Sequence, residues 1–265
     1  MIKLVIANQK GGVAKTTSAL NVARCFAERG LKVLLIDTDS QGSISTALGL
    51  KPAHFLYHFV ISNLRFKDCV VSAHPNIDVI CSNRETIDAE GILLPRTGRE
   101  LTLQIMLAPI EKLYDAIIID VAPSISLFQS CAMMYAQRML IPVTMDPLSL
   151  QGAYASIQMA RTINKLFNSA IHPAAVLPVM VDRRLQMTEL IMESLGGLAA
   201  EYDVPILPAI RVDSSIPKAS RTRHFVLDYD PKCKAAEDYM KASNQLLEHL
   251  RGQLDGKQLA LPAEA

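Results

Sequence analysis

Continuous apolar stretches recur along the chain and alternate with longer segments in which apolar residues lie three or four positions apart. The continuous stretches are rich in Val and Ile, and such runs are typical of strands covered on both faces of a parallel sheet. The longer segments have the period of helices that pack one face on a core. We expect strands at 2–8, 32–37, 77–82, 116–120, 138–144 and 175–181, and helices at 15–29, 99–112, 150–167, 186–202 and 234–251.

This alternation predicts an α/β fold, with a doubly wound, mostly parallel sheet flanked by helices. Half of the 265 residues are hydrophobic, which is enough for a full core. No linker divides the chain, so we expect one domain over residues 1–251 and a flexible tail over 252–265. No apolar run approaches the roughly 20 residues that a membrane span needs.

The first expected strand leads into NQKGGVAKTTSAL (8–20), which is similar to a phosphate-binding loop. The common pattern is G-x-x-x-x-G-K-[ST], and here Gln9 and Ala14 occupy the positions of its two glycines. A glycine turn that merely precedes K-T-T is the alternative, but the strand before and the helix after favour a phosphate site. A methyl group at Ala14 fits without strain only if φ is negative. We expect a positive φ there to weaken ATP binding while the site survives.

The residues of this loop suit a triphosphate with Mg²⁺. Gly11 and Gly12 let the backbone turn its N–H groups toward an anion, and the helix that begins near Lys15 adds its positive dipole end. We expect Lys15 to reach the β- and γ-phosphates and the Thr16 hydroxyl to bind Mg²⁺. The predicted nucleotide-binding residues are Gly11, Gly12, Val13, Ala14, Lys15, Thr16 and Thr17.

Carboxylates follow two of the expected strands. LLIDTDSQG (34–42) ends a strand with Asp37 and Asp39, and YDAIIIDVAPS (114–124) ends another with Asp120. Ligands bind at the carboxyl ends of strands in open α/β sheets, so we expect the three side chains to converge on Mg²⁺ and the γ-phosphate. Strand-end aspartates that only cap loops are the alternative for any single one of them. The predicted metal-site residues are Thr16, Asp37 and Asp120.

The overall charge gives no reason to expect a nucleic-acid partner, because 27 Lys and Arg face 26 Asp and Glu. Any basic surface must therefore be local. The five cysteines are scattered without a C-x-x-C pair, which fits a reducing cytoplasm rather than a zinc site or a disulfide framework. His54 and His58 have metal spacing, but no third ligand is apparent, so we interpret them as surface histidines.

The chain resembles the deviant Walker A family of P-loop ATPases, and in particular its ParA branch. KGGVAKTT resembles the loop K-G-G-x-x-K-T-T, LLIDTDSQGS the D-x-D-x-Q-G segment, and IIIDVAPS the Walker B strand. IPVTMDPLSLQG (141–152) and DYDPKCKAAEDY (228–239) resemble two further segments of that family. The resemblance spans residues 1–251 and implies a deviant Walker A P-loop NTPase fold with ATP and Mg as cofactors.

The resemblance also implies roles for individual residues. The early lysine of this family, here Lys10, reaches across a dimer interface to the nucleotide of the other subunit, while Lys15 holds the phosphates of its own subunit. Asp39 positions the attacking water, and Asp120 supports Mg²⁺. The residues implied in catalysis are thus Lys10, Lys15 and Asp39.

The ParA branch implies a partition or positioning ATPase that moves a plasmid, a chromosome or other cargo. Its partners would be a second copy of the chain in the presence of ATP, non-specific double-stranded DNA, and a ParB-like or other cargo adaptor that stimulates slow hydrolysis. We expect a cytoplasmic, nucleoid-associated protein with no membrane partner. Larger members carry an N-terminal helix-turn-helix domain. This chain begins at its first strand, so we expect that domain to be absent and sequence-specific repression not to occur.

In this family the C-terminal region supplies the DNA-binding basic residues. The segment 211–234 is rich in basic side chains, although Asp213, Asp228 and Asp230 reduce its charge. A basic run that is only a solvated face is the alternative. The predicted DNA-binding residues are Arg211, Lys218, Arg221 and Arg223, of which we favour the last three.

Two other functions remain open. A MinD-like ATPase that cycles on membranes shares the loop but ends in a basic amphipathic helix. Here the leucine stripe near the C-terminus is better explained as a helix that packs on the core. A metabolic ATP-dependent enzyme would need a second substrate pocket or a ligand cluster, and the sequence shows neither. The iron-protein branch needs bridging cysteines, and the isolated Cys131 is better explained as a core thiol.

Overall fold

A seven-stranded sheet forms the centre of the protein in the computed structural model, which describes residues 1–259 and, over 254–259, the backbone alone. The strand order is β3-β4-β2-β5-β1-β6-β7, and all neighbours are parallel except β3, which runs antiparallel to β4. The strands are β1 (Ile2–Ile6), β2 (Val33–Asp37), β3 (Val70–His74), β4 (Ile77–Ile80), β5 (Ala116–Asp120), β6 (Arg138–Thr144) and β7 (His172–Val179).

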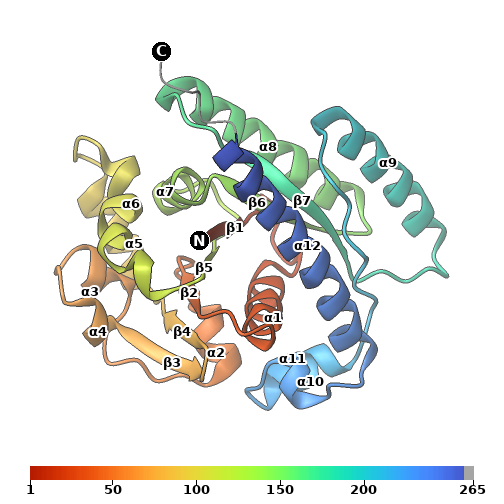
Figure 1. The fold of residues 1–265 in the computed structure, drawn as a ribbon, viewed down its shortest axis with the longest axis horizontal. Coiled ribbons are helices and arrows are strands. Elements are labelled where there is room, and N and C mark those ends of the chain that lie inside the picture. The colour runs from red at the N-terminus through yellow and green to blue at the C-terminus, as the bar shows by residue number, and fades with distance from the viewer. Residues whose placement is uncertain (260–265) are drawn as a thin grey trace.

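Helices cover both faces of this sheet (Figure 1). One hydrophobic core joins the sheet to α1 and α12, and a second joins its other face to helices that include α7, α8 and α9. The helices are α1 (Lys15–Glu28), α2 (Ser43–Leu48), α3 (Leu56–Val60), α4 (Phe66–Cys69), α5 (Glu85–Leu93), α6 (Thr102–Leu107), α7 (Leu127–Ala136), α8 (Pro147–Phe167), α9 (Gln186–Tyr202), α10 (Ser215–Arg221), α11 (Val226–Tyr229) and α12 (Lys234–Leu259), with 3-10 turns η1 (Arg99–Leu101) and η2 (Ala108–Leu113).

The expected doubly wound α/β fold is confirmed, and each expected strand is present. The sequence did not predict β3, the helices α2 to α5, α7, or the short helices α10 and α11, and the helix expected at 99–112 is divided into η1, α6 and η2. Helix α12 continues to Leu259, so residues 252–259 extend the helix that we expected to end at 251. Residues 260–265, the rest of the expected flexible tail, lie outside the described residues.

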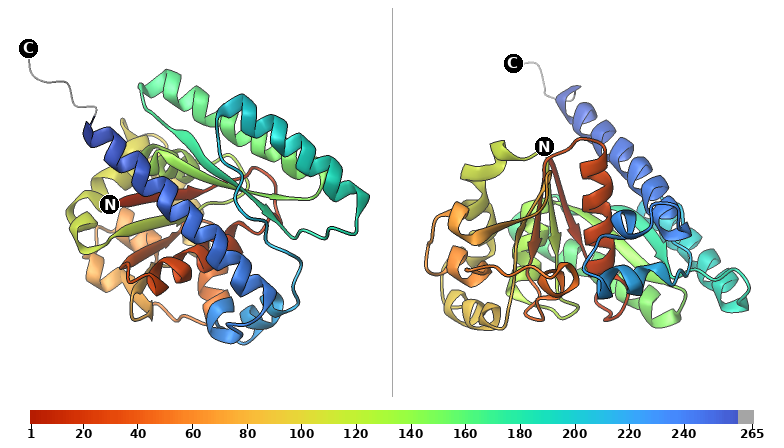
Figure 2. Two further views of the ribbon diagram at one scale, coloured as in Figure 1. Left: turned by 45° about the vertical axis from the view of Figure 1, so that its right-hand side comes forward. Right: turned by 90° about the horizontal axis from the view of Figure 1, so that it is seen from below.

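Helix α12 crosses α1, and its first turns lie beside α10 and α11 (Figure 2). Its leucines Leu246, Leu247 and Leu250 are buried in the core on the α1 side of the sheet, as expected for a packing helix. Over residues 1–259, no helix has the length and apolarity that crossing a membrane would require.

The parallel register brings the expected site residues to one edge of the sheet. Asp37 and Asp120 are direct neighbours across β2 and β5, and Ile6, the last residue of β1, lies on the other side of Asp120. The segment after β1 is the glycine loop, which enters α1 at Lys15. The loop and the two strand-end carboxylates therefore share the carboxyl edge, where an open α/β sheet binds its ligands.

Candidate functional site

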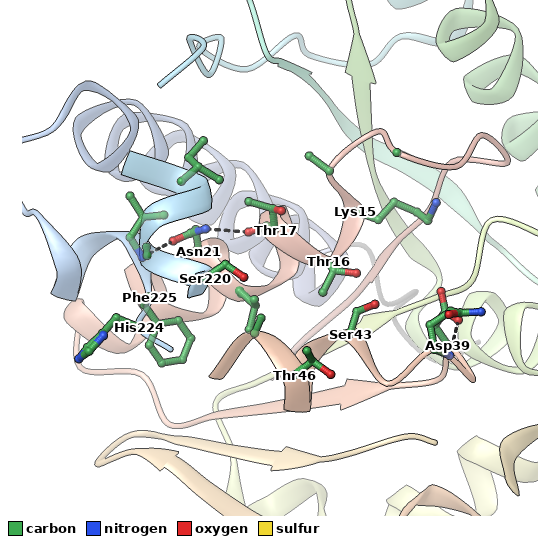
Figure 3. Close-up of a pocket in the computed structure, with 18 of the residues that line it drawn as sticks. Lys15, Thr16, Thr17, Asn21, Asp39, Ser43, Thr46, Ser220, His224 and Phe225 are labelled. Carbon is green, nitrogen blue, oxygen red and sulfur yellow. Dashed lines mark hydrogen bonds between the residues drawn. The ribbon is translucent and has the colours of Figure 1, made fainter. Parts of the chain in front are cut away.

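A cavity of about 550 Å³ opens at this edge of the sheet. The glycine loop and the first turn of α1 form its floor, the segment after β2 lies on one side, and α10 and α11 lie on the other (Figure 3). Its lining includes Asp39 and six of the seven predicted nucleotide-binding residues, namely Gly11, Gly12, Ala14, Lys15, Thr16 and Thr17, whereas Val13 is fully buried.

Lys15 is the cation at the centre of the loop. Its side chain is largely buried, and its ammonium donates to the carbonyl oxygen of Lys10 at 2.9 Å. Burial lowers the pKa of Lys15, and the nearby carboxylates of Asp120 and Asp39 act in the opposite direction. The loop thus holds a partly desolvated cation beside backbone N–H groups, an arrangement that suits the phosphate chain of a nucleotide.

Ala14 adopts the left-handed conformation, with φ of 56° and ψ of 32°. The methyl group of Ala14 is therefore strained, because only a negative φ would accommodate it without strain. A non-glycine residue in this region costs about 1 kcal/mol, because its Cβ crowds the backbone. The loop keeps the shape that glycine would favour, and the strain is stored beside the phosphate site.

The buried carboxylate of Asp120 lies beside the Thr16 hydroxyl and near the Lys15 ammonium. Neither of its side-chain oxygens finds a hydrogen-bond partner among the described side chains and backbone. Burial raises the pKa of Asp120 to about 7, although the adjacent Thr16 hydroxyl and Lys15 ammonium oppose that rise. A desolvated carboxylate next to a threonine hydroxyl fits a site for hydrated Mg²⁺, whose water ligands would supply the missing partners.

Asp37 has a different environment from Asp120. One of its oxygens accepts from the backbone N–H of Asp39 at 2.9 Å, and the other accepts from the N–H of Ile44 at 3.2 Å. Burial, followed by the neighbouring charge of Asp120, raises the pKa of Asp37 well above its ordinary value. Both oxygens of Asp37 thus shape the loop that carries Asp39 into the cavity, whereas those of Asp120 have no hydrogen-bond partner among the described residues. Both carboxylates are fully buried behind the cavity and do not line it.

Lys10 lies beside the cavity but is not part of its lining. Its ammonium donates to both carboxylate oxygens of Asp146, each at 2.8 Å. Asp146 is the N-cap of α8, where it also accepts from the backbone N–H of Ser149 at 3.0 Å. The two lysines of the loop therefore differ in their surroundings: Lys15 faces the phosphate site, and Lys10 faces α8.

The hydrogen bonds that join the loop to β6 and α8 through Asn8 could not be predicted from the sequence pattern. The buried side chain of Asn8 donates to the carbonyl oxygens of Pro142 and Ser149 and accepts from the N–H of Lys10. A Cβ on Gly152 would collide with the Asn8 side chain, so α8 approaches the loop closely only because this residue is glycine. The D-P pair at 146–147, a common helix start, is the signal that could have indicated Asp146.

In the basic segment 211–234, some of the basic side chains are paired with acids and others are exposed. The guanidinium of Arg211 donates to both oxygens of the buried Asp238 at 2.7 Å, so its charge is compensated. Lys218, Arg221 and Arg223 lie exposed along α10 and its continuation. Asp228, one of the acids of this segment, is paired with Arg24 at 2.7 Å.

The remaining candidates behave as structural residues. Cys131 is fully buried in the core, as interpreted from the sequence. The rings of His54 and His58 lie 5.0 Å apart, yet no group of three metal-ligating side chains occurs among those that the structure describes. An Mg²⁺ site built from one threonine, one carboxylate, phosphates and water does not need such a cluster.

Comparison with known proteins identifies the family of the chain. A family model described as an AAA domain matches residues 1–172. The chain is 31% identical over 259 residues to the chromosome partitioning protein ParA of Caulobacter vibrioides, covering 94% of each chain. It is 29% identical to the sporulation initiation inhibitor protein Soj of Bacillus subtilis, covering 92% of this chain and 97% of Soj.

The chain belongs to the ParA-type P-loop ATPases. The fold agrees: a crystal structure of cobyrinic acid a,c-diamide synthase from Mycobacterium smegmatis with bound ADP and magnesium superposes with a TM-score of 0.80. That protein is 26% identical to this chain, and the match covers 96% of this chain and 97% of the other. The resemblance stated from the motifs is confirmed, as are ATPase activity and the cofactors ATP and Mg²⁺ at the level of the family.

Proposed function

We propose that the chain is a partition ATPase whose ATP-bound form is a sandwich dimer that binds double-stranded DNA without sequence preference. A cargo-bound adaptor stimulates its slow hydrolysis and so releases it from DNA, which moves a plasmid, a chromosome or another cargo. The names of its relatives, chromosome partitioning protein ParA among them, support this function. On this proposal the protein works in the cytoplasm, on the nucleoid.

The observation that carries the proposal is the different placement of the two loop lysines. Lys15 lies in the phosphate cavity, whereas the ammonium of Lys10 is turned toward Asp146 and lies outside it. A loop lysine that is turned away from its own phosphates can serve the phosphates of a second subunit once its ammonium leaves Asp146. Such a cation neutralises phosphate charge only when the partner is docked, which links nucleotide binding to dimerisation.

Apolar side chains at the rim of the site support a docked partner. Ile125 follows the cavity residue Pro123 and is 74% exposed, and Leu148 follows the N-cap of α8 and is 63% exposed. Large apolar side chains that flank a polar site are typical of surfaces that another protein covers. Both would be buried when two copies meet through their nucleotide sites.

Within one subunit, each polar residue has a separate task in the proposed cycle. Lys15 and the loop N–H groups hold the phosphates, and Thr16 with Asp120 holds Mg²⁺, which neutralises charge on the β- and γ-phosphates when bound. Asp39, carried into the cavity by the loop that Asp37 organises, positions water for attack. Because the described residues offer no arginine at this site, we expect slow hydrolysis without an adaptor.

DNA binding is assigned to Lys218, Arg221 and Arg223. They are exposed, and no ion pair within the described residues occupies them. Phosphate contacts by such side chains release counterions and do not read base sequence. A dimer presents two copies of this surface, so the second contact is intramolecular and the avidity rises.

The membrane-cycling alternative depends on the C-terminal helix. Leu246, Leu247 and Leu250 are at most 5% exposed, so the part of the leucine stripe whose side chains are described packs on the core, while the side chain of Leu254 lies outside the described residues. An amphipathic membrane helix needs its apolar face free. The structure therefore favours DNA over lipid as the surface on which this ATPase cycles.

Co-sedimentation with DNA tests the proposal most directly. We expect the chain to pellet with two unrelated duplexes in the presence of ATP and Mg²⁺, and to stay in the supernatant without ATP. Lys15→Ala, which removes the phosphate-binding cation, should abolish the difference. Equal binding with and without ATP would contradict the proposed switch, and binding to liposomes in place of DNA would support the membrane-cycling alternative.

A further inference from the structure

The ion pair between Lys10 and Asp146 has a consequence for the proposed dimer. Lys10 cannot bind a partner's phosphate while its ammonium donates to both oxygens of Asp146. The side chains are 31% and 35% exposed, so the pair is neither buried nor fully solvated. An ion pair of this kind opens at a modest free-energy cost, and that cost is paid in each subunit when the dimer forms.

The backbone of Lys10 is fixed on several sides. Its N–H donates to Asn8 at 2.9 Å, and its carbonyl oxygen accepts from the Lys15 ammonium at 2.9 Å. Asn8 is itself held by the carbonyl oxygens of Pro142 and Ser149. Because the main chain is held in place, a change of partner by the ammonium requires only rotation of the side chain.

Asp146 is equally well held at the other end of the pair. It accepts from Ser149 at the start of α8 and from the Thr144 hydroxyl, in addition to Lys10. Although partial burial opposes the change, the hydrogen bonds from Lys10, Thr144 and Ser149 lower the pKa of Asp146. The hydrogen bonds from Thr144 and Ser149 do not involve Lys10, so they continue to hold the carboxylate when the ammonium leaves it.

We propose that Asp146 is a positioning residue that holds the Lys10 ammonium in the isolated subunit and thereby sets how tightly two ATP-bound subunits associate. This inference rests on the proposed role of Lys10 in the partner's nucleotide site. Asp146 acts as a latch: dimer formation exchanges its carboxylate for phosphate as the partner of Lys10.

The test is the dimer dissociation constant measured by sedimentation with ATP and Mg²⁺, in a chain carrying Asp39→Ala so that ATP persists. Asp146→Asn keeps a side-chain oxygen at the N-cap, where Asn and Asp are equally good, but removes the charge. Loss of a partly exposed ion pair is expected to tighten association by up to about fivefold per subunit, or about 25-fold for the two latches of a dimer. The gain should shrink as salt is added.

Two controls show whether Asp146 acts through Lys10. In a Lys10→Ala background, Asp146→Asn should change the dissociation constant by less than about twofold, because there is no ammonium left to release. Asp146→Glu restores a carboxylate and should return association toward that of the chain with Asp146. Tightening of the same size in the Lys10→Ala background, or weaker association in Asp146→Asn, would overturn the proposal.

A second measurement does not depend on dimerisation. The rate at which acetic anhydride modifies Lys10 in the nucleotide-free chain, followed by peptide mass spectrometry, should rise in Asp146→Asn and return in Asp146→Glu. An unchanged rate would overturn the latch. If Lys10 becomes more reactive but the chain with Asp146 intact never dimerises with ATP, the ion pair is correct and the proposed function fails. If that chain dimerises and Asp146→Asn does not tighten it, the latch alone fails.

Discussion

Ala14 places a methyl group at a point where the phosphate loop turns through the left-handed region. The neighbouring Gly12 also has a positive φ, of 76°, but it carries no Cβ and pays no steric penalty. Val13 between them is fully buried, so the loop cannot relax by turning that side chain outward. The strain at Ala14 is therefore held in place by the packing of the loop.

We predict that Ala14→Gly stabilises the folded chain by about 0.5 kcal/mol, because relief of the left-handed strain exceeds the added flexibility of the unfolded chain. Urea unfolding measures the change, and calorimetry should show tighter ATP binding. Ala14→Val is the matched control: a branched side chain at the same φ should lower both quantities. A less stable glycine variant would mean that the loop is not strained in solution.

The raised pKa of Asp120 makes the free energy of unfolding depend on pH. Its pKa is raised to about 7 by burial, above the ordinary value near 4 that it has when unfolded, so the folded chain binds this proton more tightly. Its contribution to stability is complete at acidic pH and is lost as pH rises through about 7. For the chain without nucleotide or Mg²⁺, we predict a loss on the order of 3 kcal/mol between pH 5 and pH 8.

Urea unfolding at a series of pH values checks this, with Asp120→Asn as the comparison. The amide carries no charge, so the variant should lose much less stability over the same range, and at pH 8 it should be more stable than the chain with Asp120. Mg²⁺ with ATP should restore stability at pH 8 in the chain with Asp120 only. Parallel pH profiles for the two chains would show that Asp120 is ionised in the empty site.

At the scale of elements, α2 connects the nucleotide site to the basic segment. It starts after the loop that carries Asp39 and ends at Gly49, which has φ of 65° and lies against the side chain of Arg223. A Cβ on Gly49 would overlap the Cδ of Arg223. A shift of α2 when ATP binds would therefore displace the side chain of Arg223, which is proposed to contact DNA.

We predict that Gly49→Ala destabilises the chain by about 2 kcal/mol, from left-handed strain together with the clash against Arg223. Adding Arg223→Ala should remove the clash and recover about half of that loss, which denaturant unfolding of the four chains in the cycle would measure. Simple additivity of the two changes would show that α2 and this arginine are not in contact in solution.

The elements show what the sequence could predict and where it failed. Strands buried on both faces are visible as continuous apolar runs, and Asp37 and Asp120 could be placed together because parallel strands end at one edge. Strand β3 was missed because it is a short edge strand with half-buried residues, so it lacks such a run. Helix α7 was missed because it is buried almost all round and has little periodic pattern.

The details of the site depend on contacts between distant segments, which periodicity does not reveal. The sequence predicted Lys15, Thr16 and the carboxylates, because their spacing within one loop or strand end is local. It did not predict that backbone N–H groups would occupy Asp37, nor that Lys10 would find a partner 136 residues away. Arg211 likewise counted as a free charge until the fold placed Asp238 beside it.

At the scale of the whole molecule, the proposed cycle requires that one subunit bind DNA weakly and two bind it well. The net charge of +1 gives little general attraction to DNA, so binding must come from the local basic surface. Lys218 and Arg221 project from α10, whose other side lines the nucleotide cavity through Ile216, Ala219 and Ser220. The proposed DNA surface and the nucleotide cavity thus lie on opposite sides of one short helix.

We predict that DNA binding requires ATP and weakens steeply with salt, and that exchanging Lys218, Arg221 and Arg223 together for Ala flattens this dependence. Each phosphate contact contributes about −0.9 to the slope of log K against log salt, so loss of the three contacts in each of two subunits should make the slope shallower by about 5.

Arg211→Gln is the matched control: its charge is already paired with Asp238, so the slope should change by less than about 1 although the fold is destabilised. Gel shifts on two unrelated duplexes at several salt concentrations measure the slopes, with ATP binding and dimerisation checked in each variant. A slope that responds to Arg211 and not to the other three residues would place the DNA surface on the α12 side of the segment, and a strong preference for one duplex would indicate a sequence-specific regulator.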